Sequence, residues 1–395
     1  MNAPNSGIWA KKYPDLGTGP VPAEPYLSAD YFELEKEKIF KKCWLKVARV
    51  EEVASARDYK VLPLKFADAE VIIIRGEDDQ IRGFYNTCSH RGNKVVWQNG
   101  LGHAKGGGLQ CRFHGWVYGT KGDLLSVPEE GAFFDLDKNS CRLTPVATEV
   151  WQGFVFVNLD PSPAQNLQEF LGGMGERLAG FPYDRFTEAH TYQTVLNCNW
   201  KVAQDAFSEA YHVNTIHAGS FPDGFSTELL DVQLIGPHHS CGVCQGPDVQ
   251  PPPVAALSHR LSTSSVIKQE GRGESILPPL IGNDPRHAFE LAVIFPNYLV
   301  HVLDGFYFTH QFTPIDVDHT LWEGIQYLTP PQNAGERFSQ EYAQVLQRNA
   351  WLEDTATMED THEALKSGAK PQLILQDGEI LIRHLLHVVD QIINT

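Results

Sequence analysis

The chain has 395 residues, of which 42% are hydrophobic and 11% are aromatic. This length accommodates two domains, and this composition allows each of them to bury a core. The net charge of −17 argues against nucleic acid and anionic membranes as partners, because both are negatively charged. No apolar stretch approaches the roughly 18 residues that span a bilayer, and residues 1–15 do not resemble a secretory signal. We therefore expect a soluble, cytoplasmic protein.

Residues 1–43 are expected to form an N-terminal arm and a helix that pack with the C-terminal domain. Ser28 is a typical helix cap before an apolar periodic segment. Residues 44–160 contain short strands and turns and predict a small all-β domain, in which 71–74 and 151–158 are the clearest strands.

Residues 161–395 predict a second domain that mixes helices with strands. Helices are expected at 167–178, 199–212, 336–366 and 379–393. Strands are expected at 188–196, 289–295, 298–303, 306–313 and 321–328, and a loop at 236–253. An antiparallel sheet covered by helices, of the helix-grip type, makes the fold class α+β.

Two short Cys-His pairs lie inside the all-β segment. Cys88 and His90 are separated by one residue, Cys111 and His114 by two, and a glycine follows each pair. Zinc also accepts two cysteines and two histidines, but zinc sites seldom combine these spacings. A Rieske [2Fe–2S] cluster needs this set, with the cysteines on one iron and the histidines on the other. We therefore predict that these four residues bind such a cluster.

The residues around these two Cys-His pairs narrow the class of Rieske protein. High-potential Rieske proteins carry a further cysteine in each loop, where this chain has Asn93 and Phe113. The loops, C-x-H-R-G and C-x-F-H-G-W, resemble the Rieske domain of the non-haem iron ring-hydroxylating oxygenases, specifically their α (catalytic) subunit. The other five cysteines are an odd number and do not suggest a disulfide framework. The resemblance implies a second, mononuclear iron elsewhere in the chain.

His212 and His217 are the candidate histidine ligands of this Fe(II). Five residues turn an ideal helix through about 500°, so the helix must distort or end between them. Non-haem Fe(II) oxygenases combine two histidines with one carboxylate. The segment from Asn199 to His217 is similar to the family's histidine motif, and the resemblance implies Asp354 as the third ligand, with Asp360 as the alternative.

Glu209 lies three residues before His212 and is therefore expected on the same helical face. In the family that the chain resembles, an acid at this position connects a cluster histidine of one subunit to an iron histidine of the next. The resemblance thus implies an electron route through His114, Glu209 and His212. Many ring hydroxylases have aspartate here, whereas glutamate is similar to the choline- and carnitine-oxidising branch. The alternative is that Glu209 is a solvated helix residue.

The substrate pocket is expected to include Asp205, Phe207, Val213, Trp351 and the sheet around residues 291–308. This mostly apolar set predicts ring hydroxylation of an aromatic or similarly hydrophobic compound, with Asp205 and Glu209 as catalytic-site acids. Oxidation of a quaternary ammonium or N-methyl compound is the alternative, in which Asp205 and aromatic rings would hold the cation. A plain electron carrier is the alternative that is not an enzyme.

The chain lacks a dinucleotide-binding glycine motif and a plant-type ferredoxin motif. Electrons from NAD(P)H are therefore expected to arrive through a separate ferredoxin, flavin reductase or both, with O2 as co-substrate. The resemblance implies a ring-shaped homotrimer, with or without a small β subunit.

Three further features have two interpretations each. Residues 82–121 carry six basic residues and no acid, which indicates either a docking patch for an acidic redox partner or avoidance of acids near the cluster. Cys241 and Cys244, beside His238 and His239, could form a metal or redox site, but we favour no function because a single C-x-x-C is a weak signal. Four other histidines are expected to occupy ordinary sheet or helix positions: His301, His310, His384 and His387.

Overall fold

The computed structural model describes residues 7–220, 225–245, 251–262, 276–281, 284–303 and 305–395. The chain forms two compact units, Lys36–Phe170 and the combination of Met1–Glu35 with Leu171–Thr395. The chain therefore passes between the two units near residues 35 and 170. The domain boundaries predicted from the sequence are at residues 43 and 160. None of the described helices has the length and apolarity needed to cross a lipid bilayer.

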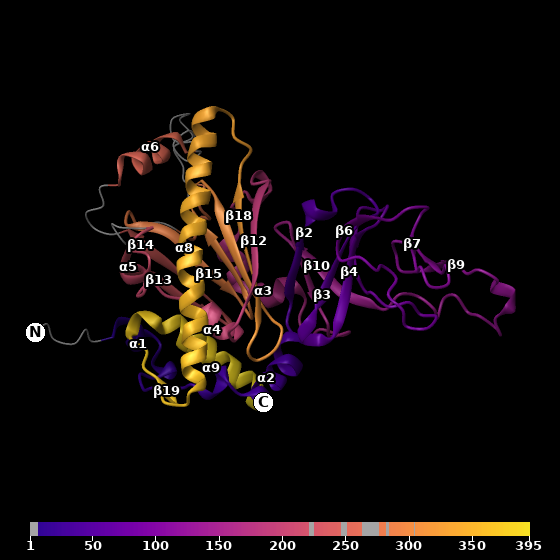
Figure 1. Cartoon of the computed structure of the whole chain (residues 1–395), viewed down its shortest axis with the longest axis horizontal. Coiled ribbons are helices and arrows are strands. Elements are labelled where there is room, and N and C mark those ends of the chain that lie inside the picture. Colours follow the sequence, from indigo (N-terminus) through magenta and orange to yellow (C-terminus); the bar gives the residue numbers. More distant parts are fainter. Residues whose placement is uncertain (1–6, 221–224, 246–250, 263–275, 282–283, 304) are drawn as a thin grey trace, which may run out of the picture. The chain divides into compact units, whose positions relative to one another are not determined.

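The smaller unit is built on an antiparallel sheet with the strand order β2-β11-β10-β5-β4-β3-β6 and a second small sheet with the order β7-β8-β9 (Figure 1). The centre of the large sheet is apolar, because residues 71–74 of β4 are fully buried. The strands are β2 (Leu45–Arg49), β3 (Asp58–Leu64), β4 (Ala69–Arg75), β5 (Ile81–Tyr85), β6 (Gly100–His103), β7 (Leu109–Gln110), β8 (Val117–Tyr118), β9 (Leu124–Ser126), β10 (Pro145–Trp151) and β11 (Phe154–Asn158). The helical turn η3 (Lys36–Phe40) precedes these strands, and three more turns lie between them: η4 (Val50–Val53), η5 (Lys65–Ala67) and η6 (Glu130–Ala132).

The prediction of one strand over residues 151–158 was wrong. β10 ends at Trp151, and β11 begins at Phe154 and returns antiparallel to it. Gln152 and Gly153 have φ values of 48° and 79°, the left-handed backbone that a tight two-residue hairpin turn requires. The apolar run conceals this turn because both strands are rich in aromatic and β-branched residues.

The larger unit contains an antiparallel sheet in the order β12-β18-β17-β16-β15-β14-β13. Its strands are β12 (Glu188–Leu196), β13 (Phe225–Ile235), β14 (His238–Gln245), β15 (His287–Ile294), β16 (Tyr298–Val302), β17 (Tyr307–Pro314) and β18 (Thr320–Leu328). The five strands predicted in this domain are confirmed. The loop predicted over residues 236–253 was wrong for its first half, which forms β14, whereas residues 246–250 lie outside the described part. β14 pairs on both sides and is buried despite its polar composition, so it has no alternating apolar pattern.

Helices cover both faces of this sheet (Figure 1). On one face lies α8 (Ala334–Lys366), whose Trp351 ring contacts Phe308 of β17 with centroids 5.9 Å apart. On the other face, Tyr307 of the same strand contacts Phe181 and Tyr183. Neighbouring residues of β17 thus point to opposite faces of the sheet, and the predicted α+β class is confirmed.

Helix α3 (Leu167–Leu178) begins in the smaller unit and continues into the larger one. The other helices and short elements of the larger unit are α1 (Ile8–Lys12), α2 (Ala29–Glu35), α4 (Trp200–Asp205), α5 (Val213–Ile216), α6 (Pro253–Leu261), α9 (Ile380–Asn394), η1 (Pro14–Leu16), η2 (Glu24–Tyr26), η7 (Tyr183–Arg185), η8 (Asp377–Glu379) and the strand pair β1 (Val21–Pro22) with β19 (Gln372–Leu373). The predicted cap is confirmed, because Ser28 Oγ accepts a hydrogen bond from the Tyr31 N–H at 3.1 Å.

The predicted helix 199–212 was wrong after Asp205, where α4 ends. The Ser208 hydroxyl donates to the Gln204 carbonyl at 2.9 Å and competes with continuation of the helix.

The start of α4 is attached to α2 by a buried ion pair. Lys201 Nζ lies 2.6 Å from Glu35 Oε1, and both side chains are fully buried. Trp200 Nε1 donates to the other oxygen of Glu35 at 2.9 Å. The N-terminal segment is thereby held against the helix that leads to the histidine pair.

Candidate functional site

The two Cys-His loops of the smaller unit have the same backbone turn. In the first loop the Gly92 N–H donates to the Cys88 carbonyl, and in the second the Gly115 N–H donates to the Cys111 carbonyl, each at 2.9 Å. Both glycines have positive φ values, 73° and 77°, which explains why a glycine closes each loop.

The four candidate cluster ligands differ in exposure. Cys88 and Cys111 are buried, whereas His114 is exposed and its ring lies 4.6 Å from that of His90. Burial is the main cause that raises the pKa of the Cys111 thiol, and the adjacent Cys88 contributes to the shift. Trp116 stacks on His90 with centroids 4.9 Å apart. Two adjacent thiols and two adjacent imidazoles fit the ligand demand of a Rieske cluster.

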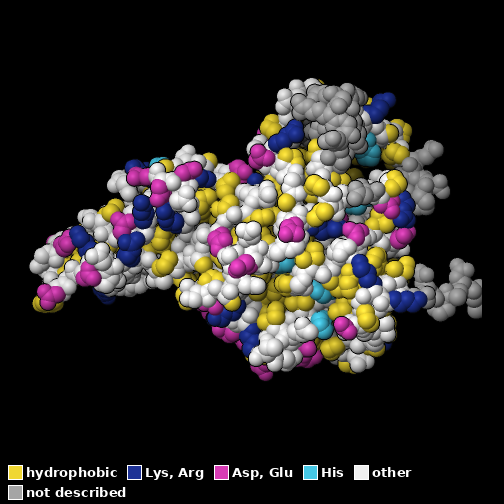
Figure 2. Space-filling view, turned by 180° about the vertical axis from the view of Figure 1, so that it is seen from behind, with side chains coloured by type: hydrophobic (Ala, Val, Ile, Leu, Met, Phe, Trp, Pro, Cys, Tyr) yellow, Lys and Arg dark blue, Asp and Glu magenta, His cyan; other side chains and the backbone are white. Residues whose placement is uncertain are grey.

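The basic stretch 82–121 is partly neutralised in the folded unit. Arg82 and Lys121 both pair with Asp78, and Lys94 pairs with Glu70. On the face of this unit that Figure 2 presents, acidic side chains lie among the basic ones. The absence of acids in the linear stretch therefore does not produce a uniformly basic surface.

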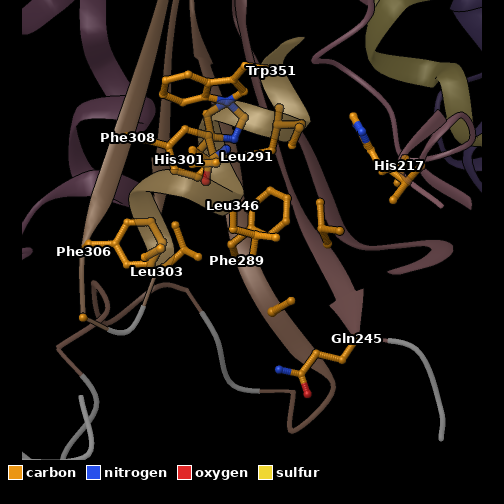
Figure 3. A pocket seen from close by; sticks show the side chains of 18 of the residues that line it. His217, Gln245, Phe289, Leu291, His301, Leu303, Phe306, Phe308, Leu346 and Trp351 are labelled. Atoms are coloured by element: carbon orange, nitrogen blue, oxygen red, sulfur yellow. The ribbon is translucent and has the colours of Figure 1, made fainter. Parts of the chain in front are cut away.

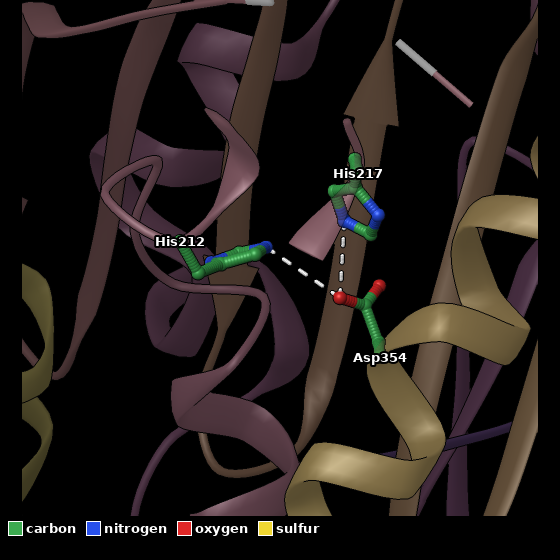
Figure 4. A group of neighbouring side chains, drawn as sticks. All are labelled: His212, His217 and Asp354. Carbon is green, nitrogen blue, oxygen red and sulfur yellow. Dashed lines mark ion pairs between the residues drawn. The ribbon is translucent and has the colours of Figure 1, made fainter. Parts of the chain in front are cut away.

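The larger unit brings His212, His217 and Asp354 together (Figure 4). One potential ligand atom from each lies within 4.8 Å of the others. Asp354 Oδ1 is 3.5 Å from His212 Nε2 and 3.1 Å from His217 Nε2. Burial is the main cause that raises the pKa of Asp354, although the two imidazoles oppose the shift. Two nitrogens and one carboxylate oxygen that converge in this way fit an Fe(II) ion with open positions.

The histidines meet by a different route from the one expected. α4 has already ended at Asp205, and the two histidines flank the single turn of α5. Their rings are 5.2 Å apart and inclined by 74°, so both Nε2 atoms reach the same carboxylate.

Two further carboxylates hold the opposite ring nitrogens. Glu209 Oε1 forms a hydrogen bond with His212 Nδ1, and Glu353 Oε2 lies 2.8 Å from His217 Nδ1. The Ser220 hydroxyl donates to the other oxygen of Glu353 at 2.9 Å. Such carboxylate partners orient metal-binding imidazoles and increase their basicity. Burial lowers the pKa of His217, but Asp354 and Glu353 outweigh it and the net effect is a raised pKa.

Sequence analysis missed Glu353. Its partner His217 is 136 residues away, so no local spacing connects the two. The adjacency of Glu353 and Asp354 could have indicated a role for both acids. Neighbouring residues on a helix point about 100° apart, so the two side chains could approach one site from two sides.

Asp360 lies away from this group. It is exposed on α8, six residues and about 600° of helical rotation after Asp354, which is buried. Among the described residues, the structure brings only Asp354 of these two carboxylates to the histidines.

A cavity of about 760 Å³ adjoins the three-residue group (Figure 3). Its described lining includes the three residues themselves and a largely apolar wall, in which aromatic and aliphatic side chains predominate: Phe207, Val213, Phe289, Leu291, Leu303, Phe306, Phe308, Leu346 and Trp351. Asp205, which was expected in this wall, is not among its described residues.

Asp205 is instead buried against the N-terminal segment. Its Oδ2 accepts a hydrogen bond of 2.5 Å from the Tyr26 hydroxyl, and its Oδ1 has no hydrogen-bond partner among the described residues. Burial is the main cause that raises the pKa of Asp205 to about 8, against the opposing effects of Tyr26 and Lys201.

This shift predicts a pH-dependent stability. In an unfolded chain the pKa of aspartate is about 3.9. Because the pKa of Asp205 is higher in the folded protein, the folded state binds this proton more tightly than the unfolded state does. The stabilisation is complete below about pH 4 and is lost as the pH rises toward 8. We expect Asp205→Asn, which keeps the acceptor for Tyr26, to flatten this decline in urea denaturation series at several pH values. The exposed Asp30→Asn variant should keep the wild-type slope, and an equal slope in Asp205→Asn would contradict the prediction.

The Cys241–Cys244 motif lies in β14, not in a loop. Both thiols are buried, as are His238 and His239. The described residues contain no three-residue metal-binding group around them. Four other histidines occupy the predicted regular elements: His301 in β16, His310 in β17, and His384 and His387 in α9.

The paired Cys-His loops and the two-histidine, one-carboxylate group define a protein with two separate iron sites. The sequence matches the family described as "Ring hydroxylating alpha subunit (catalytic domain)" over residues 183–395 and the "Rieske [2Fe-2S] domain" over residues 43–146. The chain therefore belongs to the ring-hydroxylating alpha subunit family, which confirms the resemblance inferred from its loops. Accordingly, its cofactors are a Rieske [2Fe–2S] cluster and a mononuclear iron.

Two relatives illustrate the range of the family. The chain is 38% identical over 199 residues to the 2-aminobenzenesulfonate 2,3-dioxygenase subunit alpha of Alcaligenes sp., covering 47% of each chain. It is 34% identical over 207 residues to the carnitine monooxygenase oxygenase subunit of Escherichia coli strain K12, covering 50% of this chain and 52% of that one. The matched region thus spans about half the length of these curated relatives.

Solved structures show the same fold over nearly the whole chain. A quaternary ammonium Rieske monooxygenase superposes with a TM-score of 0.78 at 24% identity, covering 96% of this chain and 97% of that one. Naphthalene 1,2-dioxygenase from Rhodococcus sp. gives 0.72 at 20% identity, with 95% and 94% covered. At these identities the likeness concerns the fold.

Proposed function

We propose that the protein is the terminal oxygenase of a multicomponent system that hydroxylates an aromatic or similarly hydrophobic substrate. The observation that carries the proposal is the convergence of His212, His217 and Asp354 beside a largely apolar cavity. His212, His217 and Asp354 would hold the mononuclear iron, and Cys88, His90, Cys111 and His114 the cluster. The iron would supply the activation of O2, which protein side chains alone do not achieve.

The surrounding residues prepare this site. Glu209 and Glu353 fix the two imidazoles with Nε2 toward Asp354, so that the ligand atoms are ordered before metal binds. The apolar wall excludes water and orients the ring of the substrate beside the site.

Electron delivery would pass between subunits. His114 is exposed, and the Glu209 side chain is 10% exposed while it holds His212. We propose that His114 of the partner subunit docks on Glu209 in a ring-shaped homotrimer. A separate ferredoxin, flavin reductase or both would pass electrons from NAD(P)H to the cluster.

Oxidation of a quaternary ammonium compound is the second candidate. The aromatic wall of the cavity and the glutamate at position 209 favour it, because aromatic rings attract such cations. Asp205, however, does not line the described wall, and Asp284, which does, pairs with Arg286 at 2.9 Å. Outside the three-residue group and Glu209, the described cavity lining thus offers a cation only Asp284, which is already paired, and this is the reason we place the hydrophobic substrate first.

Substrate-dependent O2 uptake tests the proposal. The iron-loaded protein, supplied with a chemical reductant and mediator, would be incubated with a panel of arenes and of betaines. We expect uptake coupled to a hydroxylated product for an arene. Tight coupling to a betaine would support the second candidate, and reversible cluster reduction without product from either panel would support a plain electron carrier.

Glu353 provides a prediction about metal affinity. We expect Glu353→Gln to weaken binding of Fe(II) at the three-residue site by about 10–100-fold, because His217 loses its charged orienting partner. Anaerobic titration of iron-depleted protein with Fe(II) measures this directly. The control is Glu363→Gln, an exposed acid of the same helix, and equal affinities of the two variants would contradict the role of Glu353.

A further inference from the structure

One corner of the cavity holds two polar rings among aromatic ones. His301 of β16 and Trp351 of α8 line it, and each side chain is only 2% exposed. Both rings contact Phe308 and His310, with centroid separations of 4.4 to 5.9 Å. Figure 3 shows the two side chains at the same end of the cavity. Two polar rings therefore meet inside an otherwise aromatic corner.

The ring nitrogens of this corner have no hydrogen-bond partner in the part of the chain that the structure describes. Neither ring nitrogen of His301, nor Nε1 of Trp351, has a hydrogen-bond partner among the described residues. Leaving such buried groups unpaired costs free energy. Packing does not explain the imidazole, because His301 stacks on Phe308 at 4.4 Å and 10°, a contact that a phenylalanine would make as well.

Neighbouring His310 is partly paired. Its Nδ1 accepts a hydrogen bond of 3.0 Å from Trp322 Nε1, its Nε2 has no partner among the described residues, and it is not among the described lining residues. His301 and Trp351 differ from His310 because they line the cavity.

The corner is also uncharged. No lysine or arginine belongs to the described lining, and the carboxylates that do are engaged with histidines or with Arg286. Burial lowers the pKa of His301 to about 3, so its ring is neutral near pH 7. A neutral imidazole offers one donor and one acceptor, and an indole offers one donor. This set fits an uncharged group that accepts hydrogen bonds.

We infer that His301 and Trp351 bind an uncharged oxygen substituent of the substrate, such as a hydroxyl, ether or carbonyl group on an aromatic ring. The inference rests on the proposed function and specifies its substrate class. Trp351 precedes Asp354 by about one helical turn, roughly 5 Å along α8, so the substituent would fix the ring next to the three-residue group.

Matched compounds that differ by one oxygen test the inference. The pairs are anisole with ethylbenzene and diphenyl ether with diphenylmethane. For the iron-loaded enzyme, the dissociation constant from equilibrium dialysis and the kcat/KM for O2 uptake would be measured for each compound. We expect the oxygen-containing member to be preferred by about 10-fold or more, because a site built for a hydrogen bond rejects the analogue that lacks it.

Variants assign this preference to the two residues. His301→Phe and Trp351→Phe should each reduce the preference to about 2-fold or less, and His301→Asn should retain part of it. His310→Phe, which alters the same aromatic cluster outside the described lining, should keep the wild-type ratio.

Two results would overturn the inference: equal binding of both members of each pair to the wild type, or an unchanged ratio in both phenylalanine variants. If no arene supports O2 uptake, the proposed function fails, and the dissociation constants alone decide whether the polar corner binds oxygen substituents.

Discussion

Asp354→Ala is expected to remove one of the three irons of the chain and to reduce product formation below detection. The alanine leaves His212 and His217 without the carboxylate that both Nε2 atoms face, so the proposed iron site loses its only carboxylate among the described residues. The proposed cluster ligands belong to the other compact unit and should keep their two irons. Iron analysis, the spectrum of the reduced cluster and product yield would be measured on the same preparation.

Asp360→Ala is the matched control, because it removes a carboxylate from the same helix at an exposed position. It should keep all three irons and wild-type turnover. Loss of the mononuclear iron in Asp360→Ala, with retention in Asp354→Ala, would reassign the third ligand.

Lys201→Met is expected to destabilise the larger unit by about 3–5 kcal/mol, because it leaves the fully buried Glu35 carboxylate without its cation. Burial is the main cause that raises the pKa of Glu35, and Lys201 opposes this shift. Urea denaturation of the full chain at pH 7, followed by tryptophan fluorescence, would measure the loss.

Two controls separate the buried pair from general effects. Arg337→Met breaks an exposed pair with Glu341 and should cost less than about 1 kcal/mol. The double variant Glu35→Met/Lys201→Met should recover much of the loss, since an apolar pair carries no uncompensated charge. A loss below 1 kcal/mol in Lys201→Met would show that the ion pair contributes little.

Features that depend on neighbouring residues could be predicted from the sequence. The cluster loops are an example, because cysteine, histidine and a glycine with positive φ lie within five residues of one another. The strands from β15 to β18 are another, because apolar and β-branched runs of strand length separated by turns identify them.

Some local predictions failed where composition hides the structure. β14 is central but polar, and the hairpin at Gln152 and Gly153 interrupts a continuous apolar run. The end of α4 was missed because a side-chain hydrogen bond from Ser208 leaves no mark on the apolar periodicity.

Contacts between distant segments were decided by the packing of whole elements. α8 brings Asp354 to the histidines, places Glu353 against His217 and leaves Asp360 exposed. The same packing turns Asp205 toward Tyr26 and places His301 beside the cavity with no hydrogen-bond partner among the described residues. The physical reason is the distance along the chain over which each effect acts. Ligand type and turn geometry act over a few bonds along the chain, whereas burial, pKa and the identity of a hydrogen-bond partner depend on which surfaces meet in three dimensions.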